Sequence, residues 1–108
     1  MVKDAFSVMV YQERLKIIKA LAYKPSATAK EIAETVKLNQ QSVSAHLLSL
    51  CNVGLVDRKA KPVSKYGKVF WVYSLKTEEV IKLLKEKIRQ LESLLDDLER
   101  LVAVATYY

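Results

Sequence analysis

The feature that most constrains the fold is a run of apolar residues in the last third of the chain, spaced alternately three and four positions apart. This heptad spacing places its members along one side of a helix and is typical of a coiled coil. A helix of about 29 residues, rising about 1.5 Å per residue, would be about 43 Å long, which is more than the rest of the chain can cover. The helix therefore needs a partner, for which a second copy of the chain is the simplest candidate. The residues expected at this dimer interface are Ile81, Leu84, Ile88, Leu91, Leu95, Leu98 and Val102.

Three shorter helices are predicted in the first half of the chain. Apolar residues at helical spacing predict the first of them over about residues 9–23. A Thr-x-x-Glu capping box, whose two side chains satisfy exposed backbone N–H groups, opens the second over about 29–37. Asn39 is a favourable N-cap for the third, over about 40–52, and Gly54 tolerates the left-handed conformation that ends a helix.

A β-hairpin is predicted after these helices. Its two strands are extended runs at about 55–62 and 69–75, the second of which is rich in strand-forming Val, Phe, Trp and Tyr. The segment 63–68 between them supplies a basic tip. Thr77 is then the expected N-cap of the long helix.

The composition limits the chain to one body with its appended helix. The chain has 108 residues, of which 51% are hydrophobic, and only two Gly and two Pro, which predicts a packed core and long regular elements. A single cysteine, Cys51, cannot form an intramolecular disulfide, and one thiol with one histidine is too few ligands for an ordinary zinc site. No metal and no cofactor is therefore expected. No apolar run approaches the roughly 20 residues that cross a bilayer, so the expected location is the cytoplasm, without a membrane partner.

The order of the predicted elements is that of a winged helix-turn-helix, in which the third helix enters the DNA major groove and the hairpin reaches phosphates beside it. The net charge of +6 is densest in residues 55–75, which hold five Lys or Arg against one acidic residue. The predicted fold class is mainly α with a small β-hairpin. A winged helix-turn-helix domain in residues 1–75 is followed by a coiled-coil dimerisation helix in residues 76–108. Double-stranded DNA and a second copy of the chain are the expected partners.

Four short stretches within residues 12–75 carry a family pattern: LKIIKAL from Leu15, EIA from Glu31, NQQSVSAHLLSL from Asn39 and GLV from Gly54. In these stretches the chain resembles the ArsR-like branch of winged-helix transcription regulators. The resemblance implies a homodimeric repressor that binds DNA sequence-specifically, with its recognition helix at about residues 40–52. The Cys-x-Cys pair, or the Asp and His ligands, of the metal-sensing members has no counterpart in this chain.

Candidate base-reading residues lie on the third helix, outside its apolar stripe of Val43, Leu47 and Leu50. Gln can pair bidentately with adenine, Ser can bond to several base edges, and Ala or Leu can touch a thymine methyl group. No Lys or Arg lies between Lys37 and Arg58, so we expect specificity that leans toward A·T pairs rather than direct reading of guanine. The alternative is that the polar side chains only keep an exposed helix face soluble. The residues expected to contact bases are Gln40, Gln41, Ser44, Ala45 and Leu48.

Candidate phosphate contacts lie mainly on the hairpin, where side chains can reach the DNA backbone. The alternative is a set of lysines that protects a sheet edge against aggregation. Five cations in a hairpin that follows a helix-turn-helix favour phosphate contact. The residues expected to contact phosphates are Lys30, Ser42, Arg58, Lys59, Lys61, Lys65, Tyr66 and Lys68.

Three functions are compatible with this pattern. The first is a dimeric transcription regulator, in particular a repressor, on a pseudo-palindromic operator. The second is an architectural chromatin-type protein that binds DNA with low sequence specificity, and the third is a winged helix that binds proteins instead of DNA. An enzyme is not expected, because the sequence has no Gly-rich phosphate loop and no nucleophile paired with a base.

Overall fold

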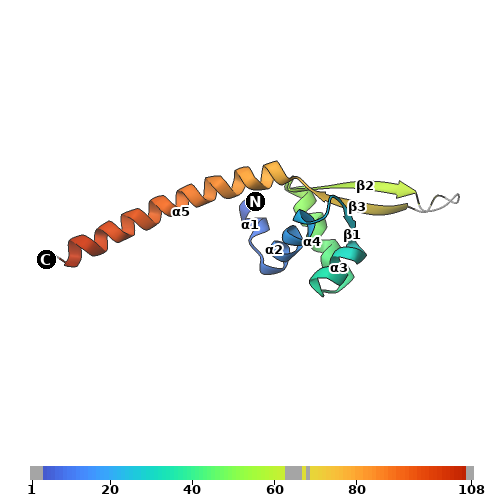
Figure 1. Ribbon diagram of the computed structural model, residues 1–108, viewed down its shortest axis with the longest axis horizontal. Coiled ribbons are helices and arrows are strands. Elements are labelled where there is room, and N and C mark those ends of the chain that lie inside the picture. The colour runs from blue at the N-terminus through green and yellow to red at the C-terminus, as the bar shows by residue number, and fades with distance from the viewer. Residues whose placement is uncertain (1–3, 63–66, 68, 107–108) are drawn as a thin grey trace.

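The computed structural model describes residues 4–62, 67 and 69–106 of the chain (Figure 1). In this part of the chain, four helices and a three-stranded sheet form a body, and a long last helix extends away from it. The molecule measures 76 × 29 × 24 Å along its principal axes because of this projection. The elements are α1 (Ala5–Met9), α2 (Gln12–Ala22), β1 (Ala27–Thr28), α3 (Ala29–Val36), α4 (Gln40–Asn52), β2 (Val56–Pro62), β3 (Val69–Leu75) and α5 (Thr77–Thr106).

The first helical segment consists of two helices, α1 and α2, whereas the sequence predicted one helix over 9–23. Asp4 caps α1, because its Oδ1 accepts a hydrogen bond from the backbone N–H of Ser7 at 2.9 Å. The same bond is the main reason that the pKa of the Asp4 carboxyl lies below its usual value. Tyr11 has extended backbone, with φ −61° and ψ 133°, and so separates the two helices. The prediction missed this break because Val8 and Tyr11 keep helical spacing across it.

The next two predicted helices are confirmed, together with their caps. At the start of α3, Thr28 Oγ1 accepts from the Glu31 N–H at 3.2 Å, and Glu31 Oε1 accepts from the Thr28 N–H at 3.0 Å. Lys37 ends α3 in the left-handed region, at φ 58°, one residue earlier than expected. Asn39 caps α4 with its Oδ1, which accepts from the Gln41 N–H at 2.7 Å. The short connection between Lys37 and Asn39 fixes the direction in which α4 leaves α3.

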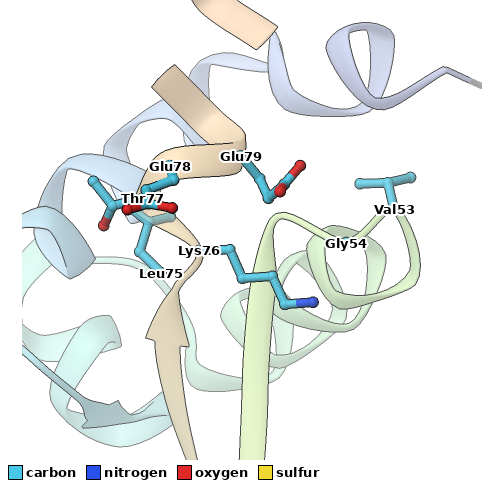
Figure 2. A pocket seen from close by; sticks show the side chains of 7 residues that line it. All are labelled: Val53, Gly54, Leu75, Lys76, Thr77, Glu78 and Glu79. Atoms are coloured by element: carbon cyan, nitrogen blue, oxygen red, sulfur yellow. The ribbon is translucent and has the colours of Figure 1, made fainter. Parts of the chain in front are cut away.

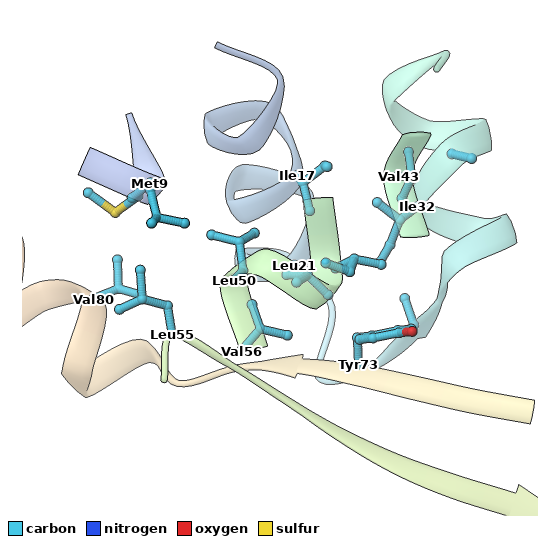
Figure 3. Close-up of a cluster of buried hydrophobic side chains, with 14 residues drawn as sticks. Met9, Ile17, Leu21, Ile32, Val43, Leu50, Leu55, Val56, Tyr73 and Val80 are labelled. Carbon is cyan, nitrogen blue, oxygen red and sulfur yellow. The ribbon is translucent and has the colours of Figure 1, made fainter. Parts of the chain in front are cut away.

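Every helix and every strand contributes side chains to the core of the body (Figure 3). The outer part of β2 contributes none. The predicted stripe of α4 is confirmed, since Val43, Leu47 and Leu50 are all completely buried. Ile32 and Ala33 of α3 pack into the same cluster. Among the described residues no polar or charged side chain is buried, so the core that holds α4 against the body is stabilised by burial of apolar surface.

The sheet has the strand order β1-β3-β2, and both pairs are antiparallel. The hairpin of β2 and β3, called the wing below, is confirmed within one residue of the predicted bounds. β1 was not predicted, because only Ala27 and Thr28 pair with β3 and two residues leave no periodic signal. The basic residues Lys65 and Lys68 and the neighbouring Tyr66 lie outside the described residues.

The long helix α5 is confirmed, but its N-cap is one residue earlier than predicted. The Val80 N–H donates to the Lys76 carbonyl at 3.1 Å, which makes Thr77 the first helical residue rather than the cap. Val80 is buried in the core, and the Lys87 ammonium lies 5.3 Å from the ring centre of Phe6 in α1. Only the first turns of α5 therefore rest on the body, and the rest projects beyond it (Figure 1).

A pocket of about 670 Å³ marks the junction between the body and α5 (Figure 2). Gly54 ends α4 there with φ +79°, as the sequence predicted, and its N–H donates to the Cys51 carbonyl at 3.0 Å. The carboxylates of Glu78 and Glu79 belong to the first turn of α5, where the helix dipole favours negative charge. The pocket contains none of the predicted DNA contacts. Its lining residues are Val53, Gly54, Leu75, Lys76, Thr77, Glu78 and Glu79.

Candidate nucleic-acid interface

The sides of α4, the predicted recognition helix, face four different surroundings. Its buried stripe faces the core, and His46 and Ser49 face α2, to which they are hydrogen-bonded. Gln40 and Ser44 border a groove beside the wing. The remaining side is open to solvent. The base-contact candidates on that open side are Gln41, Ala45 and Leu48, all of which are exposed.

Arg14 of α2 is the hub of a hydrogen-bond network that sequence reasoning missed. Its Nε donates to His46 Nδ1 at 3.0 Å, and its Nη2 donates to Ser49 Oγ at 3.4 Å. Its Nη1 donates to the carbonyl of Val8 at 2.8 Å, and its guanidinium lies 4.5 Å from the ring centre of Tyr11. One side chain thus connects α4 both to α2 and to the turn that follows α1.

His46 links α4 to a second residue of α2. Its Nδ1 accepts from Arg14, so the hydrogen of the neutral ring is on Nε2, which donates to Glu13 Oε2 at 2.7 Å. The His46 side chain is 20% exposed. These bonds fix the side of α4 that faces α2. They leave the solvent-exposed side of α4 free for a ligand.

A groove of about 460 Å³ separates α4 from the wing. Two base-contact candidates, Gln40 and Ser44, lie on one side of it, and the phosphate-contact candidate Lys30 lies at the start of α3. The opposite side is formed by β3, where the rings of Trp71 and Tyr73 share one face and Trp71 is 41% exposed. The sequence analysis did not assign these aromatic residues to the site. The groove is lined by Thr28, Ala29, Lys30, Gln40, Ser44, Phe70, Trp71 and Tyr73.

The register of the wing divides its cations between two faces. Arg58 pairs with Tyr73, which is buried, so Arg58 projects from the face that also carries Trp71. Its guanidinium lies 4.2 Å from the ring centre of Trp71. Lys59 and Lys61 project from the opposite face. The sequence placed these cations in one set, because which face of the strand turns toward α4 depends on the tertiary structure.

The other phosphate-contact candidates differ in what the structure describes. Lys30 and Ser42 are exposed, in the first turns of α3 and α4. Lys65, Tyr66 and Lys68 lie outside the described residues.

Among the described residues, no three His, Cys, Asp or Glu side chains gather closely enough to hold a metal ion. The single thiol, Cys51, is half-buried near the end of α4. Burial raises the pKa of this thiol, although the nearby Arg58 acts in the opposite direction.

The predicted dimer residues of α5 are exposed in the single chain. Ile81 is 45% exposed and Leu91 is 58% exposed, and the other residues of the stripe lie between 38% and 67%. Within the part of the chain that the structure describes, no helix is long and apolar enough to span a membrane. An apolar stripe that the body leaves uncovered needs another apolar surface.

Residues 12–58 match the family model of the bacterial regulatory proteins of the arsR family. The chain carries an ArsR-family helix-turn-helix domain. This ArsR-family domain runs from α2 to the start of β2, so it includes α3 and α4, whereas most of the wing and α5 lie beyond the match. No curated protein matches the sequence significantly.

Solved structures share the fold well beyond the ArsR-family domain. The transcriptional repressor PagR of Bacillus anthracis is 28% identical, with a TM-score of 0.58 over 74% of this chain and 87% of that one. NolR from Sinorhizobium fredii is 27% identical, with a TM-score of 0.59 over 75% and 74%. A homodimeric winged helix-turn-helix DNA-binding domain from Mycobacterium bovis, a possible ArsR-family regulator, is 22% identical, with a TM-score of 0.61 over 82% and 74%. The chain therefore has the winged helix-turn-helix fold of transcription regulators.

Proposed function

We propose that this protein is a sequence-specific, double-stranded DNA-binding transcription regulator that acts as a homodimeric repressor on a pseudo-palindromic operator. The observation that carries this proposal is the open side of α4, which belongs to the ArsR-family domain and lies beside a groove and a cationic wing. An α-helix fits the major groove of B-DNA, and hairpin cations beside it are placed to meet the phosphates.

Base reading is assigned to the accessible side chains of α4. Gln41, Ala45 and Leu48 enter the major groove first, and Gln40 and Ser44 follow at the side nearer the wing. Gln hydrogen-bonds to adenine, and Ala and Leu contact thymine methyl groups. Because α4 contains no Lys or Arg, guanine is not read directly, and the operator is rich in A·T pairs at the contacted positions.

Phosphate binding is assigned to the cations that surround this helix. Arg58, Lys59 and Lys61 on the wing and Lys30 on α3 are exposed and are long enough to reach a DNA backbone. The assignment also extends to Ser42 and to three residues that the structure does not describe, Lys65, Tyr66 and Lys68. These contacts supply affinity and orientation and carry no sequence information.

Dimerisation is assigned to α5. Its exposed heptad residues match a two-stranded seam, in which residues of one helix pack between those of the other. The Mycobacterium bovis neighbour is itself described as homodimeric, which supports the same state here. Two copies related by a two-fold axis would present two α4 helices, and an operator with two related half-sites matches that symmetry.

The proposal is tested by binding of the purified protein to DNA from upstream of its own coding region and to random DNA of equal length, across a salt series. A preference of about 10³-fold or more for the upstream DNA supports a specific regulator. Lys59→Ala should lower the salt slope by roughly one unit per lost phosphate contact in each bound copy, for both DNAs. Binding to neither DNA at low salt would contradict the proposal.

A second candidate function is favoured by the uncharged surface of α4. A helix without Lys or Arg gives weak base discrimination, which suits an architectural chromatin-type protein that binds DNA through its backbone and shape. In the same experiment, this function predicts equal and steeply salt-dependent binding to both DNAs.

A further inference from the structure

We infer that the groove between α4 and the wing receives one sugar-phosphate strand of the DNA, and that Trp71 is the positioning residue that holds Arg58 against a phosphate of that strand. The inference rests on the proposed DNA-binding function and adds a residue and a contact to it. The groove is lined on one side by Gln40 and Ser44 and on the other by Trp71.

The relevant pair is formed by neighbouring positions on one face of the wing. Arg58 lies opposite Tyr73 and Ala60 lies opposite Trp71, so Arg58 and Trp71 are diagonal neighbours, and this diagonal is within reach of long side chains. The Arg58 guanidinium lies 4.2 Å from the Trp71 ring centre, which is a close cation–π contact. A flexible cation on an exposed strand is thereby held in a restricted position.

A stacked guanidinium keeps its hydrogen-bonding capacity. The ring contacts the flat face of the group, whereas its N–H donors point outward in the plane and match the oxygens of a phosphate. In the described part of the chain, no hydrogen bond or ion pair engages the Arg58 guanidinium, and its neighbour Asp57 projects from the other face of the wing. The donors are therefore available to an external anion.

The chemistry of the groove fits a sugar-phosphate strand. Deoxyribose is largely apolar and can pack against the exposed ring of Trp71. Phosphate is anionic and meets Lys30 and the first turn of α3, whose dipole favours negative charge. A strand in this groove would run directly beside the base-reading side of α4, as major-groove insertion of that helix requires.

The test uses Trp71 itself, because it is the only tryptophan of the chain. Its fluorescence is recorded while the full-length protein is titrated with the upstream duplex and with the random duplex, and the dissociation constant is measured in parallel by anisotropy of labelled DNA. We expect the Trp71 emission to change on saturation with either duplex, and high salt to reverse the change.

A double-mutant cycle then asks whether Trp71 acts through Arg58. Trp71→Ala and Arg58→Ala should each weaken DNA binding by about tenfold. The double variant should bind DNA about as tightly as either single variant. Trp71→Phe should retain part of the affinity because it keeps a ring. The matched control is Lys59→Ala, which removes an equal charge from the neighbouring position on the opposite face. In the double variant Lys59→Ala/Trp71→Ala, the fold-losses of affinity of the two single variants should multiply.

Circular dichroism and thermal unfolding of each variant show that it is folded at the temperature of the binding measurement. If the effects of Trp71→Ala and Arg58→Ala multiply, or if saturating DNA leaves the Trp71 emission unchanged, this inference is overturned while the proposed function stands. If the wild-type protein binds neither duplex, the proposed function fails and the inference fails with it.

Discussion

Two adjacent leucines of α4 provide a sharp test of how this helix is oriented. Leu47 is completely buried and Leu48 is 46% exposed. Removing a buried leucine side chain loses about 1.5–3 kcal/mol of transfer free energy, and the cavity left in a packed core adds to that cost. We therefore expect Leu47→Ala to lower the free energy of unfolding by about 3–4 kcal/mol. Leu48→Ala should cost less than about 1 kcal/mol, because much of that side chain is already in water.

Urea unfolding followed by circular dichroism measures both values, at one fixed protomer concentration because a dimer's stability depends on concentration. For DNA affinity the exposed leucine, not the buried one, should matter more. Leu48→Ala should weaken binding to the upstream DNA, whereas Leu47→Ala, measured where it remains folded, should bind nearly as well as the wild type. Equal destabilisation by the two substitutions, or a larger effect of Leu48→Ala, would refute the orientation of α4 described above.

Three further outcomes follow from other contacts. Arg14→Met removes a donor to three acceptors and should lower the free energy of unfolding by about 2–3 kcal/mol, which urea unfolding would detect. The Thr28 N–H, aided by Lys24, holds the pKa of Glu31 below its ordinary value of 4.5, so its stabilising effect is present above pH 4.5 and is lost as the pH falls through the lowered pKa. The melting temperature of Glu31→Gln should accordingly lie below that of the wild type at pH 7 and converge with it in strong acid; a constant difference would contradict this. Leu98→Lys should split the dimer and strongly reduce DNA affinity, whereas Ser93→Lys, on the opposite side of α5, should do neither, as light scattering and anisotropy would show.

Local sequence signals were strong enough to predict most of the elements. The Thr28 capping box, the Asn39 N-cap and Gly54 each act within a few residues, so the bounds of α3 and α4 could be predicted within about one residue. The heptad pattern of α5 is equally local. The wing strands were recognisable because β3 combines aromatic and β-branched residues between turn signals.

The parts that could not be predicted depend on contacts between distant residues. Arg14 lies 32 positions from His46, and neither has a sequence signal for the other. The groove beside α4 exists only because β3 packs there, which makes Trp71, predicted only as a strand residue, a wall of the site. The placement of Arg58 beside Trp71 likewise requires the strand register.

Whether the accessible side chains of α4 read DNA sequence is tested by the specificity ratio of the double variant Gln41→Ala/Ser44→Ala. This ratio compares the affinity for upstream DNA with that for random DNA at one salt concentration. We expect the ratio to fall by at least about tenfold while affinity for random DNA stays within about twofold of the wild type. A double variant that keeps the full wild-type preference would contradict base reading by α4.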